Sequence, residues 1–201
     1  MKKIALGLAA GVLAGAAGAA DIVHQSFGEI AFKTERLSSN ESDYLKLPNA
    51  WAKAYGSFNK SLKLSPQIAE MVRVRVGQMN RCDYCNVFHT NDALEVGIVP
   101  AKVHSISTWR TSGLFSDKER AALAYAEALS SLDHEAMPAA YQQLDAVGFS
   151  AVEKEEITNC ALLMDVWARV FLAQGKTSYL QVPQKGGEAA SKPPQAEAAK
   201  K

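Results

Sequence analysis

The feature that most constrains the fold is a long helical pattern near the C-terminal end, in residues 150–175. Ser150, with Glu153 three residues later, forms a capping box of the kind that starts helices, and Gly175 is a typical helix end. Apolar side chains recur between them at helical spacing: Val152, Ile157, Ala161, Leu162, Val166, Trp167, Val170 and Phe171. We expect this helix, the longest in the chain, to form the centre of the hydrophobic core.

The other periodic segments are helical as well. Start and stop signals, such as Ser65 before Pro66 and the capping box of Ser116 with Glu119, mark their ends. They predict six further helices, at residues 48–62, 66–79, 84–96, 100–112, 116–129 and 138–147. Alternation of Val and Arg at residues 72–76 would also fit a strand, but the Ser-Pro start favours helix. The sequence therefore predicts an all-α fold of about six or seven helices.

The 201 residues suit one helical domain, expected at residues 46–184, between a lead-in segment at 21–45 and a disordered tail at 185–201. Residues 1–20 begin with Met1 and two lysines and continue as a short apolar run, which indicates a signal peptide cleaved after Ala19 or Ala20. A membrane anchor is the alternative, but the run is shorter than the roughly 20 residues that a spanning helix needs. We therefore expect a periplasmic or secreted protein.

Charge excludes one class of partner. The chain has 22 basic and 21 acidic residues, so it has no basic field that would bind nucleic acid. The sequence also suggests no cofactor. Covalent haem is excluded because Asn86 occupies the position where a Cys-x-x-Cys-His motif needs histidine.

The candidate site is a Cys-x-x-Cys motif. Cys82 lies at the N-terminal edge of the predicted helix 84–96, where free N–H groups and the helix dipole favour a thiolate. Cys85 and His89 are four residues apart and share one face of that helix, so the imidazole can exchange a proton with the thiol. Glu70, on the preceding helix, reaches this face only if the chain folds back on itself.

Glu70 lies twelve residues before Cys82, and His89 lies four residues after Cys85. Taken together, these spacings resemble the core motif of the alkylhydroperoxidase D and carboxymuconolactone decarboxylase family, and the resemblance extends over roughly residues 45–180. The resemblance implies a helical domain that assembles as a homo-oligomer, a trimer or a hexamer. It implies a thiol peroxidase in which Cys85, Cys82, His89 and Glu70 are catalytic. Cys85 would attack the peroxide and Cys82 would resolve the product to a disulfide that an external dithiol reduces.

Residues 109–110 and 115–123 support the same resemblance. One position departs from it, because peroxidases of the family can have a histidine immediately before the second cysteine, where this chain has Tyr84. We expect Tyr84 to pack rather than to react, and the proton relay to have one group fewer.

Three other functions use the same residues. The family's lactone decarboxylase activity is one, although those members generally lack the cysteine pair. A non-enzymatic secreted domain with a structural disulfide is the second, since an oxidising compartment favours disulfides. Zinc held by Cys82, Cys85 and His89 is the third, but it lacks a fourth ligand nearby in the sequence, so we expect no metal.

Residues outside the motif are expected to be structural. Cys160 lies on the apolar helix 150–175 and should be a buried, inert thiol. Asp165 and Arg169, four residues apart on the same helix, should form an ion pair. The remaining histidines, His24, His104 and His134, should lie at the surface.

Overall fold

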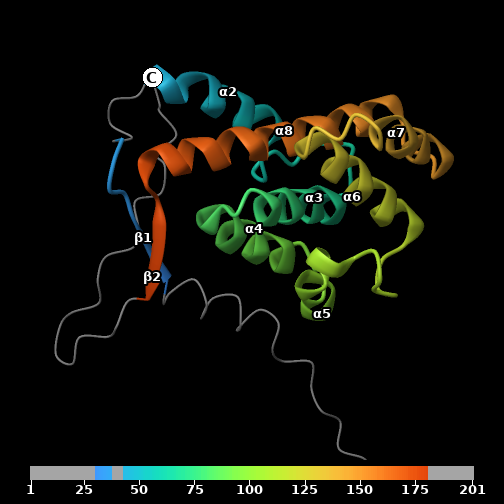
Figure 1. Ribbon diagram of the computed structural model, residues 1–201, viewed down its shortest axis with the longest axis horizontal. Coiled ribbons are helices and arrows are strands. Elements are labelled where there is room, and N and C mark those ends of the chain that lie inside the picture. The colour runs from blue at the N-terminus through green and yellow to red at the C-terminus, as the bar shows by residue number, and fades with distance from the viewer. Residues whose placement is uncertain (1–29, 38–42, 181–201) are drawn as a thin grey trace, which may run out of the picture.

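The computed structural model describes residues 30–37 and 43–180. The expected signal peptide and tail lie outside these residues, as does most of the lead-in segment. Within the described ranges, seven α-helices and two short 3₁₀ helices lie between two short strands (Figure 1). In chain order they are β1 Ile30–Lys33, η1 Asp43–Leu45, α2 Lys46–Tyr55, α3 Pro66–Met79, α4 Asp83–Glu95, α5 Pro100–His104, η2 Ile106–Thr108, α6 Asp117–Ser130, α7 Met137–Ala146, α8 Ala151–Gln174 and β2 Thr177–Leu180.

The all-α prediction is confirmed. The helix at the centre of the bundle, however, is α3 and not the long helix α8 that was expected there. It lies between α8 on one side and α4 on the other, and it also packs against α6 (Figure 1). Nine of its fourteen residues are buried, including the charged Glu70 and Arg73. The 24-residue α8 is the longest helix, as predicted, and runs along α2, α3 and α6. Burial on several sides explains why α3 shows no clean apolar stripe.

The predicted capping residues start their helices. Ser65 accepts a hydrogen bond from the Ile68 N–H, and complete capping boxes are formed by Ser116 and Ser150 with their glutamates. Gly175 ends α8 with a φ of 63°, and a Cβ there would lie 2.9 Å from the Arg36 guanidinium carbon. Glycine is therefore favoured at this position by the left-handed backbone, whereas the Arg36 guanidinium is the end of a flexible side chain that could move aside.

Two predicted helices are shorter than expected. The helix predicted at 48–62 ends at Tyr55, where Gly56 takes an extended conformation, and Phe58 is 81% exposed. The helix predicted at 100–112 ends at His104 and continues only as the 3₁₀ turn η2. Apolar spacing alone misses both ends, because it does not register a local change in backbone conformation.

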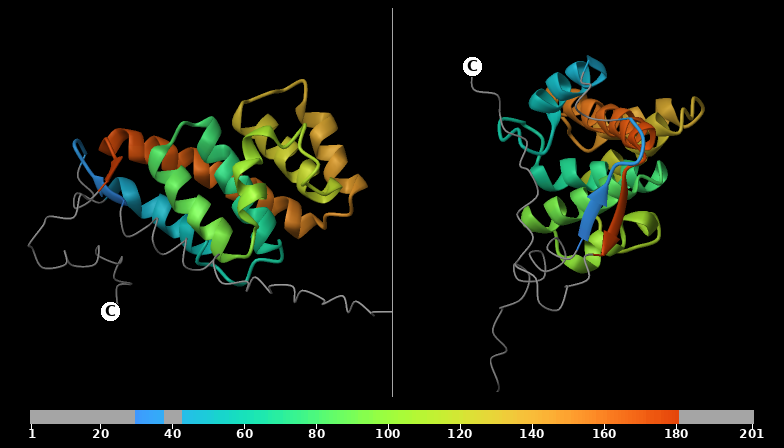
Figure 2. Two further views of the ribbon diagram at one scale, coloured as in Figure 1. Left: turned by 90° about the horizontal axis from the view of Figure 1, so that it is seen from below. Right: turned by 90° about the vertical axis from the view of Figure 1, so that its left-hand side faces the viewer.

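A two-stranded antiparallel sheet was not predicted. β1 pairs with β2 in a register that places Phe32 opposite Ser178 and Ala31 opposite Tyr179. The sheet joins the two ends of the described chain, beside the C-terminal end of α8 and the ends of α3 and α4 (Figures 1 and 2). Four residues are too few for an alternating pattern to stand out in a sequence. No helix within residues 43–180 is long and apolar enough to cross a membrane.

We expect Gly77→Ala to lower the free energy of unfolding by about 1 kcal/mol, measured by urea denaturation. A Cβ at Gly77 would lie 3.2 Å from Asn86 Oδ1 and 3.3 Å from Cys85 Cβ, so α3 and α4 would have to move apart. Overpacking costs roughly 1–3 kcal/mol, which outweighs the gain of up to about 1 kcal/mol from replacing a helical glycine. Gly113→Ala is the control, since no atom lies within 4 Å of its Cβ position and no destabilisation is expected. Equal stability of the two variants would contradict the tight contact.

Candidate active site

A disulfide between Cys82 and Cys85 lies at the start of α4, with Cα atoms 5.2 Å apart. Cys82 is the N-cap residue, and its sulfur accepts the Cys85 N–H at 3.2 Å. The two cysteines are 7% and 1% exposed. Glycine at position 77 of α3 allows this close packing of the disulfide against the centre of the bundle. The structure therefore holds the cysteine pair in its oxidised form, at a helix N-terminus and largely shielded from solvent.

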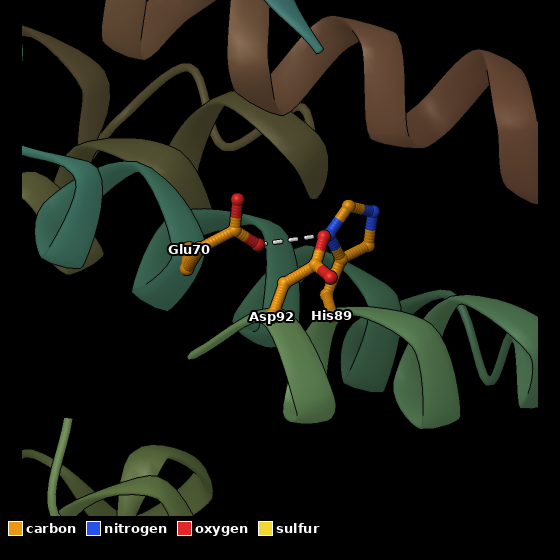
Figure 3. A group of neighbouring side chains, drawn as sticks. All are labelled: Glu70, His89 and Asp92. Carbon is orange, nitrogen blue, oxygen red and sulfur yellow. Dashed lines mark hydrogen bonds and ion pairs between the residues drawn. The ribbon is translucent and has the colours of Figure 1, made fainter. Parts of the chain in front are cut away.

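His89 lies one turn beyond Cys85 on α4, and its ring meets Glu70 of α3. The His89 Nδ1 and Glu70 Oε2 atoms are 2.9 Å apart, and Figure 3 shows the ring with its other nitrogen, Nε2, pointing away from the carboxylate. The antiparallel packing of α3 and α4 thus brings Glu70 to the histidine, as the motif required. This orientation leaves Nε2 as the nitrogen that can exchange a proton with a reacting group.

Arg73 fixes the other side of Glu70. Its Nη1 forms a buried ion pair with Glu70 Oε1, and its Nη2 donates to the Tyr55 carbonyl at 2.6 Å and contacts Cys160 Sγ at 3.2 Å. Burial alone would raise the pKa of Glu70, but the hydrogen bond with His89 and the charge of Arg73 outweigh burial, so the pKa is lowered. Glu70 is therefore an ionised carboxylate that orients the imidazole.

Two further polar residues, Ser57 and Asp92, lie at His89. The Ser57 hydroxyl is 3.3 Å from Nδ1, and Asp92 Oδ2 is 3.8 Å from the same nitrogen. Burial raises the pKa of Asp92, the nearby charge of Glu70 raises it further, and His89 only partly offsets these effects. Sequence reasoning missed both. Asp92 follows His89 by three residues on one helix face, which could have been noticed, whereas Ser57 comes from a loop without a sequence signal.

Glu70, His89 and Asp92 also form the one group in the described residues whose ligand atoms are close enough for a metal ion, all within 4.8 Å (Figure 3). The arrangement does not fit a cation site well. Arg73 already neutralises the charge of Glu70. The pKa of Asp92 is raised, which favours its uncharged form. In this oxidised form, the zinc set of Cys82, Cys85 and His89 fits no better, because a disulfide has no thiolate to offer.

The residues expected to be structural fall largely into place. Cys160 is fully buried, and burial raises the pKa of its thiol, but it borders Arg73 rather than a purely apolar shell. Asp165 and Arg169 form the expected ion pair at 3.8 Å, although Arg169 is 71% exposed and Asp165 Oδ1 also accepts from Asn80 and Ser130, each at 2.7 Å. His104 and His134 are exposed, and His24 lies outside the described residues.

Tyr84 belongs to a cluster of aromatic rings between α4 and α8. Its ring centroid lies 5.8 Å from that of Phe88 and 4.4 Å from that of Phe171. The side chain that stands where some peroxidases have a histidine therefore has a packing role in this protein.

We expect Asp92→Asn to raise the melting temperature near pH 8 and to change it little near pH 4. The folded-state pKa of Asp92 is raised, so its contribution to stability is full below its unfolded pKa and is lost as pH rises through the folded pKa. Asparagine stays uncharged throughout and avoids this loss. Glu95→Gln, which alters an exposed carboxyl group on the same helix, is the control for removing one carboxyl group from α4. A pH-independent effect of Asp92→Asn would contradict the assignment.

Comparisons with known proteins agree with this fold. Residues 46–128 match the model of the Carboxymuconolactone decarboxylase family. The uncharacterised protein YdfG of Bacillus subtilis is 24% identical over 121 residues, which are 59% of this chain and 80% of YdfG.

Solved structures show the same fold. A protein of unknown function from Agrobacterium tumefaciens, assigned as a candidate antioxidant defence protein AhpD, superposes with a TM-score of 0.63 at 23% identity, over 71% of this chain and 96% of that one. The debrominase Bmp8, solved with 2,3,4-tribromopyrrole, has a TM-score of 0.56 at 21% identity, over 64% of this chain and 67% of that one. The match of residues 46–128 to the family model and the shared fold support an assignment of the chain to the alkylhydroperoxidase D and carboxymuconolactone decarboxylase family.

Proposed function

We propose that the protein is a thiol-dependent peroxidase. The observation that carries the proposal is the hydrogen bond between His89 Nδ1 and Glu70, one helical turn beyond the Cys82–Cys85 disulfide. A disulfide that only staples the fold needs no oriented histidine, whereas a thiol that reacts at neutral pH needs a base, because an ordinary thiol with a pKa of about 8.5 is mostly protonated there.

The reaction begins from the reduced dithiol. Cys85 gives its proton to His89 Nε2, and the thiolate attacks one peroxide oxygen. As the O–O bond breaks, the departing alkoxide takes the proton from His89, so that an alcohol leaves and Cys85 becomes a sulfenic acid. Glu70, held by Arg73, stabilises the transient imidazolium.

The Cys82 thiol then condenses with the sulfenic acid. A sulfur–sulfur bond forms and water leaves, which gives the disulfide present in the structure. Two electrons and two protons from an external dithiol restore the thiols. The reductant's two sulfurs become a disulfide in turn, so the cycle balances without a bound cofactor.

Export and assembly form part of the proposal. The apolar residues 1–20 support export to the periplasm or outside the cell, where the reductant would have to be one present in that compartment. Intact mass of periplasmic material should show a chain beginning at Ala20 or Asp21. Assembly as a trimer or hexamer rests on the family resemblance.

The test is to add one equivalent of hydrogen peroxide to the fully reduced protein and to count thiols. We expect two thiols to disappear and one Cys82–Cys85 disulfide to form, with steady consumption of peroxide when dithiothreitol is present. His89→Ala should slow the first step by about a hundredfold to ten-thousandfold, the range of a positioned general base. Turnover of a muconolactone with no peroxide consumption would favour the decarboxylase, and inactivity in both assays would favour a structural disulfide.

A further inference from the structure

The two strands at the chain ends contact the residues between the two cysteines. Phe32 and Ser178 are paired in register, so they lie on the same face of the sheet, and this face meets the start of α4. The Ser178 N–H donates to Asp83 Oδ2 at 2.6 Å, and the Phe32 ring lies edge-on to Tyr84 with centroids 4.6 Å apart. Both strands lie outside the range 46–128 that matches the family model.

Lys176, just before β2, completes this set of contacts. Its Nζ lies 4.2 Å from the centroid of Tyr84 and 5.0 Å from that of Phe171. Burial lowers the pKa of Lys176, which is consistent with an ammonium group enclosed between the rings. Asp83 and Tyr84 are therefore each held from outside the helix bundle, and with them the first turn of α4.

This arrangement bears on how the disulfide can be reduced. A reducing thiolate must approach one sulfur closely and form a mixed disulfide with it. Both cysteines are almost completely buried while the first turn of α4 is held in place. A small dithiol needs only a narrow path to reach Cys82. A protein dithiol must also place its own surface against the first turn of α4.

We propose that the terminal sheet, residues 30–33 and 177–180, positions the redox pair and limits access to it, so that small dithiols reduce the disulfide in preference to protein dithiols. The physiological meaning of this selectivity rests on the proposed peroxidase function. The selectivity itself is a property of the oxidised protein.

The test compares reduction of the oxidised full-length protein by dithiothreitol and by thioredoxin with its reductase. In Phe32→Ala, we expect thioredoxin to act about three to ten times faster than on the wild type, the range set by losing one aromatic pair, while the rate with dithiothreitol changes by less than that. Ser178→Pro, which removes the N–H that binds Asp83, should act in the same direction. Tyr179→Ala is the matched control, because Tyr179 lies on the opposite face of the same sheet and neither rate should change.

Unchanged thioredoxin rates in both Phe32→Ala and Ser178→Pro would overturn the proposal. Equal acceleration with both reductants would overturn it as well, because it would mean that bond reactivity changed rather than access. Circular dichroism of each variant establishes that the helices remain folded. No peroxide is used, so failure of the peroxidase proposal would leave these rates readable.

Discussion

Cys85→Ser is expected to abolish peroxide reduction, whereas Cys82→Ser should still react once and stop as a sulfenic acid on Cys85. The structure contains features that favour each of the two thiols as the attacking group. Cys82 is the N-cap of α4, its sulfur accepts the Cys85 N–H, and it is the more exposed of the two cysteine residues. These features favour the Cys82 thiolate by up to about 2 kcal/mol, the upper size of a helix-dipole effect at a partly buried site.

The oriented base favours Cys85 by more. His89 lies one turn from Cys85 and is held by Glu70 at 2.9 Å, whereas seven residues separate it from Cys82. A positioned base contributes a factor of about a hundred to ten thousand, or roughly 3–5 kcal/mol, so it outweighs the helix terminus. We therefore expect the base to decide which thiol attacks.

Each serine variant should be treated with one equivalent of peroxide and a dimedone-type reagent, with the label located by mass spectrometry. Cys82→Ser should carry the label on Cys85, and Cys85→Ser should carry almost none. Cys160→Ala, tested in the same way, should behave as the wild type because Cys160 is fully buried. Labelling of Cys82 in Cys85→Ser would assign the attack to Cys82 and leave His89 as an acid for the leaving group.

The parts of the fold set by local chemistry could be predicted from the sequence. Capping residues such as Ser116 and Ser150 act through hydrogen bonds within three residues, so their signals are complete in the sequence itself. The same holds for Gly175. Cys85 and His89 share a face because helix geometry fixes residues four apart. The pairing of Glu70 with His89 followed from the family's motif spacing rather than from local chemistry.

The parts that depend on distant packing could not be predicted. Arg73 lies three residues after Glu70 on α3, but it also reaches Tyr55 and Cys160 across the core, which helical spacing does not indicate. Ser57 approaches His89 because α2 stops early at Tyr55, which apolar spacing did not indicate. The terminal sheet forms because α8 brings residues 177–180 next to residues 30–33. A pattern of four residues in the sequence cannot indicate this pairing.

Arg73→Met is expected to lower the free energy of unfolding by about 3–5 kcal/mol, the usual cost of leaving a buried charge unpaired. The side chains of Glu70 and Arg73 are each only 3% exposed, so water cannot replace the lost partner. Urea denaturation at neutral pH provides the measurement. Arg73→Lys should lose less, because it keeps the charge but cannot bind Glu70, Tyr55 and Cys160 together.

Two comparisons separate charge from packing. The folded-state pKa of Glu70 is lowered, so its stabilising contribution is present above the unfolded pKa and is lost as pH falls through the folded pKa. In Arg73→Met the pKa of Glu70 should rise, so the gap in stability from the wild type should narrow as pH falls toward about 4.

Glu70→Gln combined with Arg73→Met should recover much of the stability, because no unpaired charge remains. It should not recover peroxidase activity, because a neutral amide in place of the Glu70 carboxylate would not stabilise the imidazolium of His89. A double variant as unstable as Arg73→Met would assign the loss to packing and remove the electrostatic role of Arg73.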